Sequence, residues 1–247
     1  MNTFDIVVPT LFGVEAVTAK EIRNLGYDIK NTSDGRVTFL GDFDAVARAN
    51  INLRTGERVL IKVAEFKAET FDELFENTYN IDWSVWLSKN SHFPVKGFSL
   101  RSKLYSVPDC QSIIKKAIVN SLMKKYNTQF LPERGTTYQI EFSIIRDTVC
   151  IMIDTTGAPL HKRGYRIKHN AAPIRETLAA AIAILSRFSY SGIMADPFCG
   201  SGTFPIECAM IAKNIAPGVN REFSAMDFAQ IEKKNMDGCF GGSKRLC

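Results

Sequence analysis

The first 66 residues alternate between the two-residue hydrophobic period of strands and the longer period of helices. Four runs rich in β-branched residues predict strands, at 4–9, 27–30, 36–40 and 58–66. Two segments with apolar residues at helical spacing predict helices, over 13–25 and from the capping residue Asp42 to Asn50. Ser33-Asp34-Gly35 predicts a hairpin turn between the two middle strands. The resulting order, βαββαβ, is that of a ferredoxin-like unit.

The next ninety or so residues predict a second module of strands and helices. Helices are predicted over 70–79 and 107–126, and strands at 98–102, 138–145 and 148–154. Thr70 and Glu73 have the spacing of a capping box, which marks the start of the first of these helices. Arg146-Asp147 is predicted to turn the last hairpin, and Trp83 and Trp86 are predicted to be core or interface anchors. Residues 155–159 then form a short linker.

Beyond this linker, two predicted helices flank a short apolar run. Pro173 suits the first position of a helix, and apolar residues follow at i, i+4, i+8 and i+11, namely Ile174, Leu178, Ile182 and Leu185. That spacing is typical of a helix that packs on a core. Ile193-Met194-Ala195 predicts the end of a buried strand, and residues 204–212 predict another helix.

The segment between that strand and that helix has the most specific chemistry in the chain. It reads Asp196-Pro197-Phe198-Cys199-Gly200-Ser201-Gly202-Thr203. A strand, a Gly-x-Gly turn and a helix start together present backbone N–H groups and a helix dipole to an anionic part of a ligand. Gly200 and Gly202 lack a Cβ, so a ligand can approach the main chain closely. The sequence therefore predicts a ligand-binding loop here.

Two well-known phosphate-binding loops do not fit this segment. A P-loop requires a lysine after its last glycine, whereas Thr203 and Phe204 follow Gly202. The dinucleotide fingerprint requires a third glycine where this chain has Pro205. The eight residues 196–203 instead resemble the first S-adenosylmethionine-binding motif of amino-group methyltransferases. The resemblance implies that S-adenosylmethionine is the cofactor and that these eight residues bind it.

Composition narrows the class of protein further. The hydrophobic content of 45% indicates a globular chain, and its length of 247 residues is enough for two domains. No secretory leader is predicted, and the longest uncharged stretch after residue 170 is about half of a membrane span. The six cysteines include no Cys-x-x-Cys pair and no metal-like spacing with the three histidines. We therefore expect reduced thiols, no metal, no membrane association and a cytoplasmic location.

The net charge of +5 is distributed unevenly along the chain. Residues 101–170 carry 12 lysines and arginines against 5 acidic residues, whereas residues 1–100 carry 11 against 14. A basic surplus confined to one segment is expected of a surface that binds a polyanion such as nucleic acid. A solvated helix face would explain Lys115-Lys116 and Lys124-Lys125 equally well.

Most of the chain resembles the THUMP-domain RNA methyltransferases, in particular the bacterial branch that modifies guanine N2 in large-subunit ribosomal RNA. The resemblance is carried by the ferredoxin-like start, the module that ends near residue 154, and the segments 160–166, 172–180 and 216–221. It implies an α/β fold with an α+β N-terminal part. The expected domains are a ferredoxin-like unit (1–66), a THUMP-like RNA-binding module (67–155), a linker (156–172) and part of a Rossmann-like methyltransferase domain (173–247).

The same resemblance extends the set of site residues. The helix that precedes the first cofactor motif packs beside S-adenosylmethionine in this family, which adds Thr177 to the cofactor residues. RNA is the expected partner, in particular ribosomal RNA. Seven basic residues of the basic block are expected to contact it: Lys115, Lys116, Lys124, Lys125, Lys162, Arg163 and Arg166.

The chain departs from the family after the first cofactor motif. It has neither the acidic residue that holds the cofactor ribose nor an Asn-Pro-Pro-Tyr-like loop that orients the target amino group. Residues 233–247 lose helical and strand periodicity, which suggests a truncated or frame-shifted methyltransferase domain that is inactive alone. The catalytic residues are therefore not identified. Two alternatives stay open: an RNA-binding module with a vestigial methyltransferase segment, and a DNA adenine-N6 methyltransferase, because that class has a similar loop.

Overall fold

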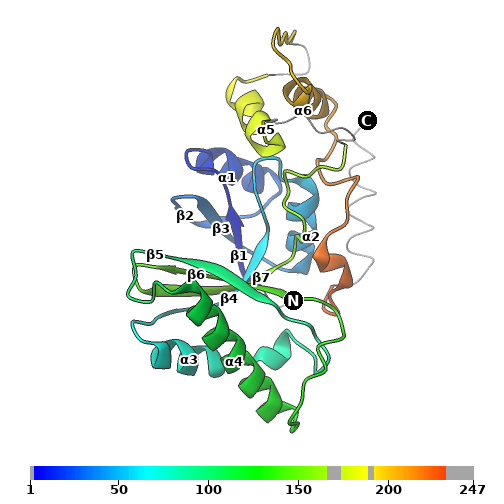
Figure 1. Ribbon diagram of the computed structural model, residues 1–247. Coiled ribbons are helices and arrows are strands. Elements are labelled where there is room, and N and C mark those ends of the chain that lie inside the picture. Colours follow the sequence, from blue (N-terminus) through cyan, green and yellow to red (C-terminus); the bar gives the residue numbers. More distant parts are fainter. Residues whose placement is uncertain (1–2, 166–173, 189–191, 232–247) are drawn as a thin grey trace. The chain divides into compact units, whose positions relative to one another are not determined.

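The computed structural model describes residues 3–165, 174–188 and 192–231 (Figure 1). Within these ranges the chain forms two compact units. The first unit joins the N-terminal segment up to Leu60 to Thr155–Met226. The second unit consists of Ile61–Asp154 and Asp227–Gln230. The chain therefore passes from one unit to the other near residues 60 and 155, and again on either side of Asp227–Gln230.

The first unit begins with the predicted order of elements. Its strands β1 (Phe4–Pro9), β2 (Ile29–Ser33) and β3 (Arg36–Gly41) are antiparallel in the order β2-β3-β1. The helices α1 (Glu15–Asn24) and α2 (Phe43–Asn52) follow β1 and β3. The βαββαβ order is completed by β4 (Leu60–Lys67), which belongs to the second unit from Ile61 on. Asp42 caps α2 as predicted, because its carboxylate accepts the Ala45 N–H at 3.0 Å. The first strand of the hairpin begins at Ile29, two residues later than predicted.

A buried polar cluster fixes the loop that follows α2. The Glu21 carboxylate of α1 accepts the backbone N–H groups of Arg54 and Thr55, each at 3.0 Å, and the Thr55 hydroxyl at 2.5 Å. Burial raises the pKa of Glu21, and these three donors counteract that effect. The Thr18 and Thr55 hydroxyl oxygens are 2.7 Å apart. The backbone of residues 54–55 is therefore held in one position, which matters for the site described below.

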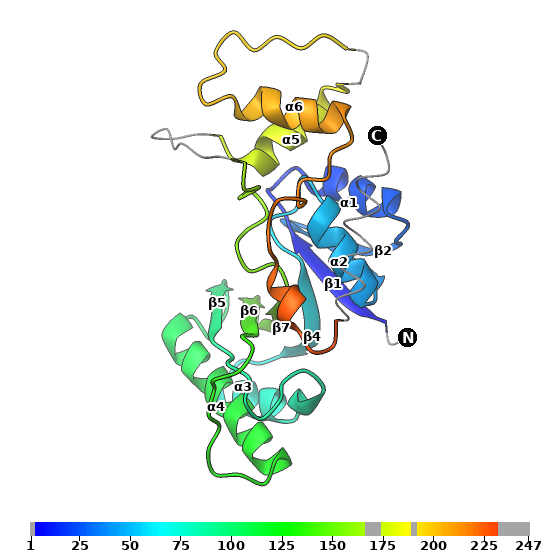
Figure 2. The same cartoon turned by 90° about the vertical axis from the view of Figure 1, so that its right-hand side faces the viewer.

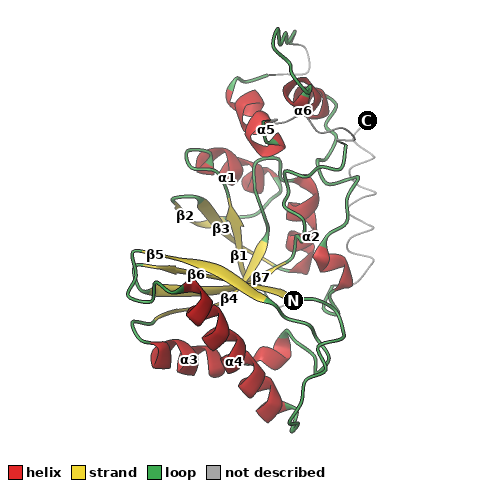
Figure 3. Cartoon of the chain, in the orientation of Figure 1, coloured by secondary structure: helices red, strands yellow, loops and turns green. Residues whose placement is uncertain are grey.

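The second unit is a mixed sheet covered by helices (Figure 3). Its strand order is β4-β7-β6-β5, with β5 (Val95–Leu100) parallel to β6 (Gln139–Ile145) and β6 antiparallel to β7 (Thr148–Asp154). The helices are α3 (Phe71–Tyr79) and α4 (Val107–Lys125), with a short 3-10 turn, η1 (Trp83–Val85). The predicted capping box is confirmed, since Thr70 accepts the Glu73 N–H and Glu73 accepts the Thr70 N–H. Trp83 is buried in the core, and its indole N–H donates to the Thr78 carbonyl at 2.9 Å.

Two helices and a 3-10 turn follow the linker in the first unit: α5 (Glu176–Leu185), α6 (Thr203–Ala212) and η2 (Ser224–Asp227). α5 and α6 lie side by side (Figure 2). The prediction of a buried strand ending at residues 193–195 is wrong, since the backbone there is irregular and Ile193 is fully exposed. A strand requires hydrogen-bonded neighbours, and no described strand pairs with this segment.

The orientation of α5 also differs from the prediction. The helix begins at Glu176, and four of its six buried residues are alanines, the other two being Glu176 and Thr177. Ala181 packs against Val14 and Val17 of the N-terminal segment. The large apolar residues Ile182 and Leu185 are exposed instead, as is Ile174 just before the helix. Small side chains allow the helix backbone to approach the core, and the large ones therefore remain available on the other face.

The described residues also bear on the expected thiols, metal and membrane association. Cys110, Cys150, Cys199 and Cys208 are free thiols. Within the described ranges, no group of three or more histidine, cysteine or acidic side chains is placed to hold a metal ion. No helix in those ranges is long and apolar enough to cross a membrane.

We predict that Gly97→Ala destabilises the second unit and that Ser99→Ala does not. A Cβ at position 97 would lie 2.2 Å from the Phe142 carbonyl oxygen, so β5 and β6 would have to separate. Overpacking of this kind costs about 3 kcal/mol. The Ser99 hydroxyl is buried without a hydrogen-bond partner, so its removal should change stability by less than about 0.5 kcal/mol.

Urea denaturation followed by tryptophan fluorescence measures both effects, because both tryptophans of the chain, Trp83 and Trp86, lie in this unit. Equal unfolding midpoints for the two variants would show that the close approach of β5 and β6 at Gly97 is not required.

Candidate functional site

The loop before α6 folds into a tight turn stabilised by its own atoms. Asp196 Oδ1 accepts the Phe198 N–H at 3.1 Å, and the Gly202 N–H donates to the Cys199 carbonyl at 2.7 Å. Gly200 and Gly202 have φ angles of 53° and 73°, in the left-handed region that glycine adopts without strain. The two glycines are therefore required by the turn itself.

The turn delivers the chain to the N-terminus of α6. Gly202 is the residue that precedes the first helical position, Thr203, and the hydroxyl oxygens of Ser201 and Thr203 lie 3.1 Å apart. The first turn of a helix has backbone N–H groups without intrahelical partners, and the helix dipole makes this end positive. A Cβ built on Gly200 or Gly202 would have no atom nearer than 3.8 Å, so the space beside the main chain is open. This end of α6 is therefore suited to an anionic group.

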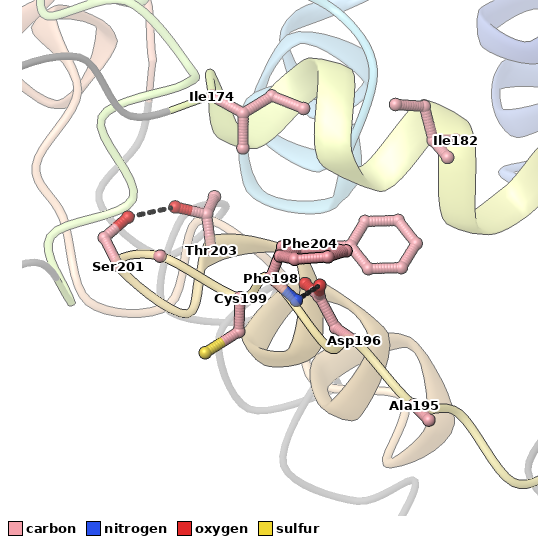
Figure 4. Close-up of a pocket in the computed structure, with 10 residues that line it drawn as sticks. Ile174, Ile182, Ala195, Asp196, Phe198, Cys199, Ser201, Thr203 and Phe204 are labelled. Atoms are coloured by element: carbon pink, nitrogen blue, oxygen red, sulfur yellow. Dashed lines mark hydrogen bonds between the residues drawn. The ribbon is translucent and has the colours of Figure 1, made fainter.

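A pocket of about 500 Å³ lies between this loop and α5 (Figure 4). Ile174 and Ile182 form its wall on the α5 side, and Figure 4 shows both pointing toward the loop. The loop contributes Asp196, Ser201 and Thr203 as polar groups. The other lining residues are Ala195, Phe198, Cys199, Gly200 and Phe204. An apolar wall with a few convergent polar groups is typical of a small-molecule site.

Most of the predicted cofactor residues meet at this pocket. Six of them line it: Asp196, Phe198, Cys199, Gly200, Ser201 and Thr203. Pro197 and Gly202 belong to the same turn but are outside the lining. Thr177 is buried away from the pocket, where its hydroxyl donates to Glu57 Oε1 at 2.6 Å. The resemblance placed this helix beside the cofactor, but Ile174 and Ile182 were not among the predicted site residues, because their spacing is more often that of a core helix than of a cofactor wall.

Behind the loop, α6 is anchored by a buried charged cluster. Glu207 of α6 is fully buried, with Arg163 Nε 3.5 Å from its Oε1 and the Tyr165 hydroxyl donating to the same oxygen at 2.9 Å. The Arg163 guanidinium also donates to the Leu160 carbonyl at 2.8 Å and to the Arg54 carbonyl. Burial raises the pKa of Glu207, and Arg163 counteracts it. The cluster thus connects α6 to the loop held by Glu21.

This cluster corrects one predicted RNA contact. Arg163 is only 2% exposed, and its donors are directed at buried acceptors, so it does not present charge to RNA. The neighbouring Lys162 is exposed, and Arg166 lies outside the described residues. Sequence reasoning predicts that a basic residue in a basic segment lies on the surface unless a buried acidic partner is known. Here that partner, Glu207, is distant in the sequence, so the pairing could not be anticipated.

The four lysines of α4 are in different environments. Lys115 is half-buried, with Nζ 2.7 Å from Glu133 Oε2 and 3.4 Å from the centre of the Phe93 ring, and burial lowers its pKa. Lys125 pairs with Asp82 at 3.4 Å. Lys116 and Lys124 are exposed. Two of the four predicted RNA contacts therefore already have acidic partners.

Three known domain families match the chain in succession. Residues 5–60 match the RlmL ferredoxin-like domain, residues 68–154 match the THUMP domain, and residues 163–240 match the RMKL-like methyltransferase domain. Together with the loop, the pocket and the mixed sheet, these matches define the class as a THUMP-domain methyltransferase. The chain belongs to the THUMP-domain RNA methyltransferase family of RlmL-like and YpsC-like proteins.

Individual relatives agree with this assignment. The chain is 47% identical over 235 residues to "Putative RNA methyltransferase YpsC" of Bacillus subtilis, covering 94% of this chain and 61% of the relative. It is 32% identical over 218 residues to a tRNA (guanine(6)-N2)-methyltransferase of Methanocaldococcus jannaschii, covering 85% and 57%. The solved structure "Crystal structure of SMU.472, a putative methyltransferase complexed with SAH" superposes with a TM-score of 0.95 at 42% identity. The match covers 100% of this chain and 66% of that chain. The chain thus spans about three fifths of the length of these curated relatives.

We predict that Arg163→Met destabilises the first unit by about 3–5 kcal/mol at neutral pH, because it leaves Glu207 as a buried charge without its cation. The double variant Arg163→Met/Glu207→Leu should regain most of this loss, since the charge is then removed as well. Arg23→Met, on the exposed face of α1, is the matched control. Urea denaturation, monitored by circular dichroism, measures the free energy of unfolding of the single variant, the double variant and the control. A double variant as unstable as the single one would contradict the pairing.

The raised pKa of Glu207 predicts a pH dependence of stability. The contribution of a carboxyl whose folded pKa lies above its unfolded value, here 4.5, is complete below that value and is lost as pH rises through the folded pKa. Glu207→Gln cannot ionise. The melting temperature of the wild type minus that of Glu207→Gln should therefore fall between pH 4 and pH 7. A difference that rises over this range would mean that Arg163 lowers the pKa more than burial raises it.

Proposed function

We propose that this chain provides the RNA-binding part and the cofactor loop of an enzyme that transfers a methyl group from S-adenosylmethionine to guanine N2 in RNA, with ribosomal RNA as the substrate. The observation that carries the proposal is the pocket of about 500 Å³ between α5 and the glycine turn at the N-terminus of α6. The structure of a relative with bound SAH supports the choice of cofactor. We also propose the domain boundaries 1–66, 67–155, 156–172 and 173–247.

The residues present fit the methionine half of such a cofactor. The N–H groups at Gly200 and at the start of α6 would bind its carboxylate, because the helix end is positive and the space beside the glycines is open. The Asp196 carboxylate would bind its ammonium group. Ile174 and Ile182 would contact the apolar part of the molecule. The bound cofactor would supply an electrophilic methyl group on its sulfonium sulfur.

The guanine N2 target is supported by resemblance to the family and by the activity named for the M. jannaschii relative. Transfer to an exocyclic amine requires the methyl carbon and the nitrogen lone pair to be aligned at close distance. It also requires acceptors for the amine protons. No Asn-Pro-Pro-Tyr-like sequence occurs in the 247 residues. We therefore expect these residues alone to bind cofactor and RNA without transferring the methyl group.

A second candidate function is that of an RNA-binding module, which the match of residues 68–154 to the THUMP domain supports. The third alternative, a DNA adenine-N6 methyltransferase, is supported only by the similar loop in that class of enzyme. Transfer of labelled methyl groups to RNA and to DNA separates these functions when it is measured on a chain that contains the acceptor sequence. Labelled guanine in RNA supports the proposal, labelled adenine in DNA replaces it, and no label on either favours the RNA-binding module.

We predict that the 247-residue chain binds S-adenosylmethionine with a Kd near one millimolar, about −4 kcal/mol, because only the methionine half has partners. Amide chemical shifts in a nuclear magnetic resonance titration should change at Gly200–Thr203. Gly202→Val should abolish these changes by filling the space beside the turn. Gly13→Val is the matched control, since Gly13 also has a positive φ, 84°, with no atom within 4 Å of its Cβ position.

Micromolar binding by the wild type would show that the adenosine half is held by residues of this chain as well. No shift change at about 10 mM cofactor would contradict the assignment of the loop. Equal effects of Gly13→Val and Gly202→Val would attribute the loss to general destabilisation.

A further inference from the structure

One corner of the second unit combines exposed arginines with a strained backbone. Arg146 and Asp147 form the two-residue turn between β6 and β7, in which Ile145 pairs with Thr148. Their φ angles are 49° and 61°, and Arg101, which follows β5, has a φ of 50°. Two-residue turns with two positive φ angles strongly favour Asn-Gly, because other side chains are disfavoured there. The arginine at position 146 is therefore not explained by the turn.

The two arginines leave the sheet side by side. β5 and β6 are parallel, and Leu100 and Ile145 are partners in their register, so Arg101 and Arg146 follow at the same end of adjacent strands. The Arg146 N–H donates to the Leu100 carbonyl at 3.2 Å, which fixes the two backbones to each other. Both arginines are exposed.

Asp147 makes this corner rigid. Its Oδ1 accepts the Lys103 N–H at 2.7 Å, and its own N–H donates to the Ser102 hydroxyl at 3.1 Å. The loop after β5 and the β6–β7 turn are thus hydrogen-bonded to each other on both sides of Arg101 and Arg146. A strained conformation that is held by several hydrogen bonds is often found where a side chain has a function.

Apolar and aromatic side chains are exposed next to the arginines. Phe98 and Leu100 alternate along β5, so they lie on one face of the strand, and each is about half exposed. β5 is the last strand in the described order β4-β7-β6-β5. Tyr105, in the loop after β5, is 83% exposed. Guanidinium groups beside exposed aromatic rings are the combination that binds single-stranded nucleic acid, through phosphate contacts and base stacking.

We infer that this corner, formed by Phe98, Leu100, Arg101, Tyr105 and Arg146, binds a single-stranded segment of RNA. The arginines contact phosphates, and the rings of Tyr105 and Phe98 stack on bases. The inference rests on the proposed RNA function and adds a contact surface that the α4 lysines do not provide, since Lys115 and Lys125 already have acidic partners. It also gives a reason for an arginine in a turn that favours asparagine.

The test measures fluorescence anisotropy of a labelled single-stranded RNA of about ten nucleotides with the full chain at several salt concentrations. Asparagine tolerates the left-handed backbone and carries no charge, so Arg101→Asn and Arg146→Asn should keep or raise the melting temperature. Each should reduce the slope of log K against log salt by about 0.7, the value for one phosphate contact on a single strand. Tyr105→Leu should weaken binding roughly tenfold with an unchanged slope.

Arg187→Asn is the matched control. Arg187 is exposed in the first unit with a φ of 57°, so the substitution makes the same change of charge in the same backbone conformation. It should leave the affinity and the slope unchanged. Corner variants that bind like the wild type, or a control that loses as much affinity as they do, would overturn the inference. If the wild type itself binds no RNA, the proposed function fails as well.

Discussion

The position of the candidate cofactor loop depends on the buried interaction between Arg163 and Glu207. Glu207 lies in the second turn of α6, so fixing its carboxylate fixes the helix whose N-terminus carries the glycine turn. Arg163 extends the interaction to the Arg54 carbonyl, and the backbone at Arg54 is held in turn by Glu21 of α1. Buried charges tolerate little displacement, because losing a partner leaves an unsolvated ion. The loop is therefore held in a fixed position relative to the N-terminal part of the first unit by side chains from three distant segments.

The sequence predicted the features that local chemistry determines. The βαββαβ order, the Asp42 cap and the Thr70 capping box follow from periodicity and from side chains that bond their own helix ends. The left-handed glycines of the loop follow from the turn. The prediction of a strand ending at residues 193–195 was wrong because a strand is not determined by local chemistry alone: it requires neighbouring strands to hydrogen-bond with. The prediction that Arg163 contacts RNA failed for a similar reason, because the environment of this side chain is set by Glu207 of α6, which is distant in the sequence.

α5 shows how a correct pattern can receive the wrong orientation. Its large apolar residues and its alanines both follow helical spacing, and the preference of large residues for burial suggested that they face the core. The core contact is made by the alanines, which let α5 approach Val14 and Val17 closely. Ile182 is then left on the opposite face, where it lines the pocket with Ile174. The apolar wall of the site is thus a consequence of close helix packing behind it.

The same left-handed backbone occurs at both proposed binding surfaces, with different residues in it. At Gly200 and Gly202 the open space lies beside the main chain, so a ligand can reach backbone N–H groups only if no Cβ is present. At Arg101 and Arg146 the backbone is equally unfavourable for a side chain, yet long cationic side chains are present. A glycine would serve the corner better if only the turn mattered. The choice of residue therefore separates a surface that recognises its ligand through the main chain from one that does so through side chains.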